Sequence, residues 1–106
     1  MKQKDENEML FDIVEILSRD YEWRKSVIRE KRMTSRVRTE YSYINAKLYA
    51  ASQDIVGPQY ADIFIHEIGN KIGFAKSRVD CMSEGTYKLY KTRIKLNMLK
   101  KLYLLD

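Results

Sequence analysis

The chain has 106 residues, of which 44% are hydrophobic and 33% are charged. This composition excludes a wholly disordered protein and fits a single domain, residues 1–106, with a core of modest size. The single cysteine excludes an internal disulfide and indicates a reducing compartment. The opening residues lack the basic and apolar pattern of a signal peptide, and no apolar run reaches the roughly 20 residues of a membrane span. We therefore expect a cytoplasmic protein with no membrane contact.

The formal net charge is +5, and it is unevenly distributed along the chain. Residues 71–106 hold nine Lys or Arg against three Asp or Glu, whereas residues 1–70 hold eleven against twelve. A second basic cluster consists of Arg24, Lys25, Arg29, Lys31, Arg32, Arg36 and Arg38. Two basic clusters on a small domain favour a polyanionic partner, with a solvated basic surface as the alternative.

Turn-forming residues are scarce, with four Gly and one Pro in the chain. Few turns favour long helices over strands, so we expect an all-α fold of about five helices. The first helix is predicted by a stripe with i, i+3, i+4, i+7 spacing, Leu10, Ile13, Val14 and Leu17. The helical spacing continues over 21–28, either after a kink or in a second helix.

The next helix is predicted by an apolar stripe at Val37, Tyr41, Ile44 and Leu48. Thr34 or Ser35 is available as its N-cap, because a short hydroxyl side chain accepts a hydrogen bond from the first turn. We expect this helix to end near Ser52.

Gly57-Pro58 is the clearest turn signal, and proline suits the first turn of the helix that follows. The residues of that helix expected to face inward are Tyr60, Ile63, Phe64 and Ile68. Gly69 and Gly73 frame its end, and a short helix is predicted over 75–81.

The last helix is expected to begin after Ser83, whose hydroxyl can cap it, and to run to about Leu104. One side of this helix is apolar and carries Tyr87, Tyr90, Ile94 and Leu102. The side predicted to lie opposite carries Lys88, Lys91, Thr92 and Lys95. A helix with such a cationic side fits the major groove of B-DNA, where lysines neutralise phosphates and short polar groups near the helix start reach base edges.

The stretch SEGTYKLYKTRIKLNML, residues 83–99, resembles the recognition helix of the fourth conserved region of sigma factors. The longer stretch 64–94 is similar to phage regulators of the ArpU and RinA type, which use the same helix-turn-helix fold. In this resemblance 64–68 lies in the supporting helix, 75–82 is the first helix of the motif and 83–95 is the reading helix. The turn Asp80-Cys81-Met82 departs from the family's apolar-glycine-apolar turn.

The resemblance implies a sequence-specific transcription regulator of phage or mobile-element genes that binds double-stranded DNA. Residues 58–104 would form the helix-turn-helix part, and the helices of 1–55 would serve homodimerisation or contact with RNA polymerase. The residues that would face DNA are Ser83, Glu84, Thr86, Lys88, Lys91, Thr92 and Lys95. Lys76 and Arg78 would contact phosphates from the first helix of the motif.

A function of another class stays open beside this one. A small interaction module, such as a phage-encoded inhibitor or antirepressor, would dock its basic faces on an acidic protein. His66-Glu67 resembles the start of a zinc-binding HExxH helix, but Asn70 replaces the second His, so no metal or cofactor is expected. Cys81 is expected to be buried rather than reactive. No nucleophile–base pair or phosphate-binding glycine loop is present, so we do not expect an enzyme.

Overall fold

The computed structural model describes residues 5–106, and over this range it consists of five α-helices and one short 3₁₀ helix, with no strand. The predicted all-α class is therefore confirmed. Residues 1–4, part of the polar start of the chain, lie outside the described residues. None of the described helices is long and apolar enough to cross a membrane.

The first two helices are separated by a break rather than a kink. α1 (Glu6–Arg19) begins after Asp5, whose carboxylate accepts a hydrogen bond from the N–H of Glu8 at 2.8 Å. α2 (Tyr21–Arg29) follows after the single residue Asp20, so the stretch 21–28 forms a second helix.

α3 (Ser35–Val56) is the longest helix, and Thr34 rather than Ser35 caps its start. The Thr34 hydroxyl accepts a hydrogen bond from the N–H of Val37 at 3.3 Å. The helix runs past the predicted end near Ser52 and stops at Gly57, whose φ of 82° lies in a region that other residues rarely adopt. α4 (Pro58–Gly69) begins at the next residue, with the proline in its first turn as predicted.

The predicted short helix over 75–81 is wrong. This part of the chain contains one 3₁₀ turn, η1 (Phe74–Lys76), followed by irregular backbone up to Ser83. The last helix, α5 (Glu84–Lys101), then starts where predicted, because the Ser83 hydroxyl accepts a hydrogen bond from the N–H of Thr86 at 3.2 Å. The first helix of the expected helix-turn-helix motif is therefore replaced by a loop.

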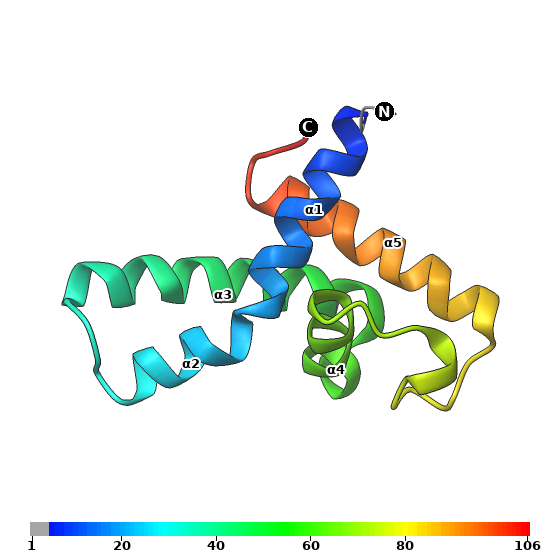
Figure 1. Ribbon diagram of the computed structural model, residues 1–106, viewed down its shortest axis with the longest axis horizontal. Helices are drawn as coiled ribbons and strands as arrows, with labels where there is room; N and C mark the ends of the chain where they lie inside the picture. Colours follow the sequence, from blue (N-terminus) through cyan, green and yellow to red (C-terminus); the bar gives the residue numbers. More distant parts are fainter. Residues whose placement is uncertain (1–4) are drawn as a thin grey trace.

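α3 organises the arrangement of the other helices (Figure 1). α2 runs back along one half of α3, so that the two helices form a protruding arm. The other half of α3 contacts α4 and α5. α1 crosses the centre of the molecule and contacts both α4 and α5.

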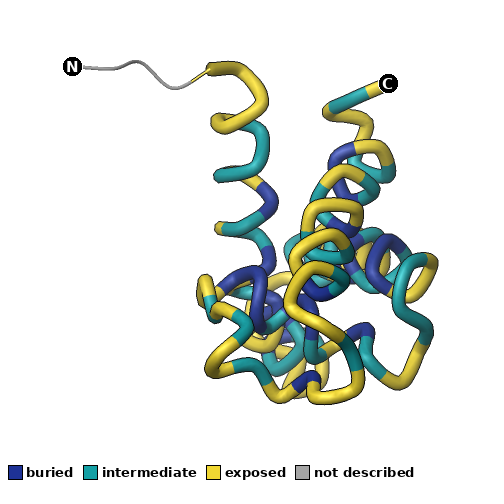
Figure 2. Tube along the Cα trace, turned by 90° about the vertical axis from the view of Figure 1, so that its right-hand side faces the viewer, coloured by how far each residue is buried: buried dark blue, intermediate teal, exposed yellow. Residues whose placement is uncertain are grey.

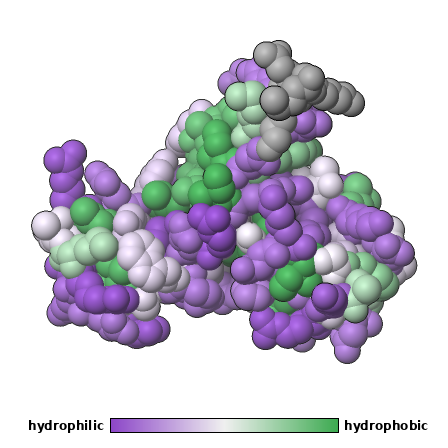
Figure 3. Space-filling model, in the orientation of Figure 1, coloured by the Kyte–Doolittle hydropathy of each residue, from purple (hydrophilic) through white to green (hydrophobic). Residues whose placement is uncertain are grey.

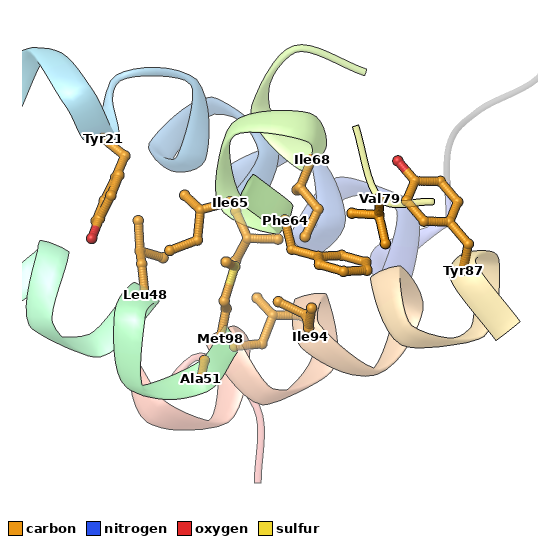
Figure 4. Close-up of a cluster of buried hydrophobic side chains, with 12 residues drawn as sticks. Tyr21, Leu48, Ala51, Phe64, Ile65, Ile68, Val79, Tyr87, Ile94 and Met98 are labelled. Carbon is orange, nitrogen blue, oxygen red and sulfur yellow. The ribbon is translucent and has the colours of Figure 1, made fainter. Parts of the chain in front are cut away.

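The core lies where α3, α4 and α5 meet (Figure 4). Its fully or almost fully buried side chains include Leu48, Ala51, Phe64, Ile65, Ile68, Ile94 and Met98. The inward orientation predicted for Phe64 and Ile68 is confirmed. Burying a side chain of this size stabilises the fold by about 1.5–3 kcal/mol relative to leaving it exposed.

α1 packs on this core through only part of its predicted stripe. Leu10, Val14 and Leu17 face the core, whereas Ile13, at the edge of the same stripe, is exposed. The end of α1 lies against the end of α4 at Gly69, where an added Cβ would be 2.3 Å from the backbone N of Arg19. Any larger residue at this position would push the two helices apart.

Candidate nucleic-acid interface

α5 presents a different set of cations to solvent than its sequence pattern indicated. Tyr87, Ile94 and Met98 are buried against the core, as expected for the apolar side. At 3.6 residues per turn, Lys91 lies only about 40° around the helix from Tyr87, and Lys95 about 80°. Both lysines therefore lie toward the inner side of α5, and the prediction that they lie opposite Tyr87 is wrong.

The contacts of Lys91 confirm this inner position. Its ammonium group donates a hydrogen bond to the backbone oxygen of Ile72 at 2.7 Å and lies 5.2 Å from the centre of the Tyr87 ring. Burial, together with the nearby positive charge of Lys95, holds the pKa of Lys91 below its ordinary value, although Glu67 and Glu15 act in the opposite direction. The side chain thus joins α5 to the chain that follows α4.

Lys95 joins α5 to α1. Its ammonium group lies 3.5 Å from a carboxylate oxygen of Glu15 and 4.8 Å from the centre of the Phe11 ring. Only 19% of the Lys95 side chain is exposed, so its charge is largely committed to the interior. Lys91 and Lys95 therefore use their charges in contacts within the fold, and neither is available to a ligand in this structure.

The outer face of α5 carries the remaining predicted residues and two cations that the sequence pattern did not single out. The exposed residues of this helix are Glu84, Gly85, Lys88, Leu89, Thr92, Arg93, Leu96 and Lys100. Lys88 pairs with Glu84 at 3.0 Å across one helical turn, and Thr92 donates to the Lys88 carbonyl at 3.2 Å. Lys88, Thr92 and Lys100 lie about 100°, 140° and 220° around the helix from the buried Tyr87, so they are turned away from the core.

At its N-terminal end, α5 is capped by Ser83. Ser83 is exposed and donates its hydroxyl hydrogen to Thr86 Oγ1 at 3.1 Å while accepting from the Thr86 N–H. Thr86 is half-buried, so its side chain serves the cap rather than the outer surface. Gly85 has open space beside it, which leaves room for a close approach to this end of the helix.

The loop before α5 is held by the buried carboxylate of Glu67 on α4. Its oxygens accept hydrogen bonds from the Ser77 hydroxyl at 2.6 Å, the Tyr87 hydroxyl at 2.7 Å and the Arg78 N–H at 2.8 Å. Burial alone raises the pKa of Glu67, but these three hydrogen bonds outweigh burial, and the pKa lies below its ordinary value. Burial and the contact with Glu67 raise the pKa of Tyr87 to about 12.

This network explains why the predicted helix over 75–81 is absent. The N–H of Arg78 and the hydroxyl of Ser77 are used by Glu67, which is fully buried. Val79, only 2% exposed, packs into the hydrophobic core and holds the loop against it. The sequence pattern presented Glu67 only as part of an incomplete HExxH motif. The signal for its role was its position beside Phe64 and Ile68 on a helix with an apolar inner face.

The loop before α5 places Lys76 and Arg78 at the surface, and Arg78 lines a hollow together with Glu22, Asp62 and His66 of α2 and α4. Figure 2 views the molecule from this side and shows exposed residues along both the loop and the helix. In residues 5–106, Lys76, Arg78, Arg93 and Lys100 are exposed and have no carboxylate within ion-pair distance. We call these four residues, with Lys88 and Thr92, the α5 cationic face.

The second basic cluster behaves differently. Arg24 is buried, and its guanidinium donates to the side-chain oxygen of Asn45 at 2.7 Å and to the backbone oxygen of Leu17. The other members lie on the arm, where most are paired: Lys25 with Glu22 and Asp62, Arg29 and Arg32 with Glu30, and Arg36 with Glu40. Lys31, at the tip of the arm, is the exposed member without an ion pair there. The arm is therefore a weaker candidate than α5 for a polyanion.

The other candidate sites of the sequence have ordinary surroundings. His66 is half-buried, with Nδ1 3.2 Å from the side-chain nitrogen of Asn70. Over residues 5–106, no group of three or more His, Cys, Asp or Glu side chains is placed to hold a metal ion. Cys81 is exposed, so the expectation that it is buried is wrong.

Comparisons with protein-family models, with curated proteins and with solved structures find no match to this chain. The similarity to ArpU- and RinA-type regulators therefore stays a prediction from the residues.

Proposed function

We propose that the protein binds double-stranded DNA through the α5 cationic face and regulates transcription, as its resemblance to phage regulators of the ArpU and RinA type implies. The observation that carries the proposal is the position of its exposed cations without ion pairs. Four of them, Lys76, Arg78, Arg93 and Lys100, lie on one helix and the loop that precedes it in the chain. Cations that no carboxylate neutralises are the ones that release the most counterions when they meet phosphates.

The shape of this face supports the same proposal. An exposed α-helix of this diameter fits the major groove, and its start would approach the base edges. Lys88 would exchange an exposed ion pair, worth little in water, for a phosphate. Thr92 would offer its hydroxyl oxygen to a base edge, and Leu89 would contact a thymine methyl group.

The proposed regulation is tested by selecting bound fragments from the genomic DNA of the source organism, followed by fluorescence anisotropy on the selected duplexes. We expect one or a few enriched sites. Arg93→Ala/Lys100→Ala should weaken binding to the selected duplex at least tenfold. The slope of log K against log salt should fall by about 0.9 for each phosphate that the variant no longer neutralises.

A matched control removes the same charge from the arm, with Arg32→Ala/Arg36→Ala, and should bind nearly as tightly as the wild-type protein. Equal losses in both variants would point to non-specific attraction by net charge alone. An absence of DNA retention even at low salt would contradict the proposal.

A protein partner is the second candidate, and one observation favours it. Leu89 and Leu96 are 48% and 37% exposed at the middle of the α5 cationic face. An apolar centre with a charged rim is common in protein interfaces. In that case the partner would be an acidic protein, and Leu89→Ala/Leu96→Ala would abolish its capture. The same variant would change the salt dependence of DNA binding little, because neither residue carries charge.

A further inference from the structure

α1 carries a second apolar stripe next to the one that faces the core. Its inner side packs Leu10, Val14 and Leu17 against the core. Its outer side carries Met9, Ile13 and Ile16, which follow i, i+4, i+7 spacing and are 56%, 40% and 51% exposed. A surface helix of a soluble protein usually has one apolar stripe and a polar face toward water. The exposed stripe of α1 therefore resembles a surface that packs against another molecule.

Exposed apolar side chains also lie in the C-terminal segment. The C-terminal segment lies beside the start of this helix, where a hollow of about 330 Å³ is lined by Glu6, Asn7, Leu10 and residues 103–106. Tyr103 and Leu104 of this segment are 80% and 43% exposed. Figure 3 shows hydrophobic side chains gathered in the upper part of the molecule, where α1 and the C-terminal segment lie.

The charges that flank the stripe indicate what covers it. Asp12 and Arg19 are seven residues apart, so they lie two turns from each other on the same flank of α1, beside Ile16. If two α1 helices pair antiparallel with Ile13 of each against Ile16 of the other, Asp12 of one copy comes beside Arg19 of the second copy. The two-fold symmetry repeats this contact. A parallel two-fold pairing would instead place this flank of the two copies on opposite sides of the contact, so Asp12 and Arg19 would not meet.

We propose that the protein forms a homodimer in which α1 packs antiparallel on α1 of a second copy, with Met9, Ile13 and Ile16 at its centre. The antiparallel orientation also places the negative end of each helix dipole beside the positive end of the other. Glu6 and Asp20 lie one turn farther from the centre, where crossing helices diverge and like charges repel less. The proposal goes beyond DNA binding and does not depend on it.

The pairing is tested by sedimentation equilibrium of the full chain over a range of concentrations, without DNA. We expect a reversible dimer at about 100 µM, because a contact of a few turns is small among stable interfaces. Ile13→Glu/Ile16→Glu should be monomeric at every concentration, with an unchanged helical circular-dichroism signal. The control Met33→Glu removes a side chain of matched exposure, 52%, at the tip of the arm, and should dimerise as the wild type does.

A charge exchange tests the orientation. Asp12→Arg and Arg19→Asp should each weaken the dimer at least tenfold, since each places like charges together at two positions. An equimolar mixture of the two variants should recover the dimer, because each charge then meets its opposite. A wild-type protein that stays monomeric at about 100 µM would overturn the proposal. So would a dimer that survives Ile13→Glu/Ile16→Glu, or a mixture that recovers nothing.

Discussion

Two regions of the molecule each enclose one charged side chain, and they satisfy it in different ways. At the loop before α5, the carboxylate of Glu67 accepts three hydrogen bonds and lies near the positive charge of Lys91. At the base of the arm, Arg24 donates to two neutral oxygens, and no carboxylate lies within ion-pair distance of it in the described part of the chain. Burial lowers the pKa of Arg24, with Asp20 acting in the opposite direction.

The difference follows from the backbone that each residue serves. The irregular loop exposes N–H groups, and a carboxylate accepts several of them at once. The end of α1 instead exposes carbonyl oxygens such as that of Leu17, and a guanidinium supplies several donors in a fixed geometry. Asn45 completes the second region by donating to the backbone oxygen of Tyr21 at 3.1 Å. Each buried charge thus replaces backbone hydrogen bonds that a regular helix would have made for itself.

The largest effect is expected for Glu67→Ala. This change leaves Ser77, Tyr87 and the Arg78 N–H without their acceptor in a buried site, and it should lower the free energy of unfolding by about 3–5 kcal/mol. Urea denaturation measures the loss, with Glu22→Ala as a control at an exposed ion pair. If the two variants are equally stable, the network does not hold the loop.

A smaller effect is expected for Arg24→Met. Methionine fills much of the same volume, and the groups left unpaired are the neutral oxygens of Asn45 and Leu17, so the cost should be about 1–3 kcal/mol in the same urea experiment. This variant should leave the loop and its Lys76 and Arg78 in place. A decrease larger than that of Glu67→Ala would reverse the order that the comparison predicts.

The smallest effect is a pH dependence. The folded pKa of Glu67 lies below its unfolded value of about 4.3, so its contribution to stability is complete above that value and is lost as pH falls through the folded pKa. Stability should change with a slope of up to about 1.4 kcal/mol per pH unit in this window. Glu67→Gln should flatten the slope, whereas Arg24→Met should keep it. Unfolding curves between about pH 2 and pH 6 decide between these outcomes.

Local features of the fold were predictable, because they depend on residues close together in the chain. Ser83 caps α5 as predicted, Thr34 is the one of two predicted candidates that caps α3, and Pro58 starts α4. Gly57 ends α3 a turn later than expected. The inward positions of Phe64 and Ile68 followed from helical spacing in the same way.

The candidate interface was only partly predictable. Lys88 and Thr92 lie on the outer face of α5 as expected, whereas Lys91 and Lys95 bind the interior through Ile72 and Glu15. The positions of both lysines relative to Tyr87 were present in the sequence, but the run of lysines obscured them. Arg93 gave no such signal, because its role depends on which side of α5 the core covers.

The sequence by itself determined an all-helical chain with capped helix starts and an excess of positive charge toward its C-terminal end. Hydrogen bonds within one helical turn and the helical period of about 3.6 residues are enough for that. Only the tertiary structure decided that 77–83 is a loop, because its hydrogen-bond acceptor, Glu67, belongs to another helix. It also decided which cations of the described residues lack an ion pair and which apolar side chains of α1 stay exposed, since both depend on contacts between segments far apart in the chain.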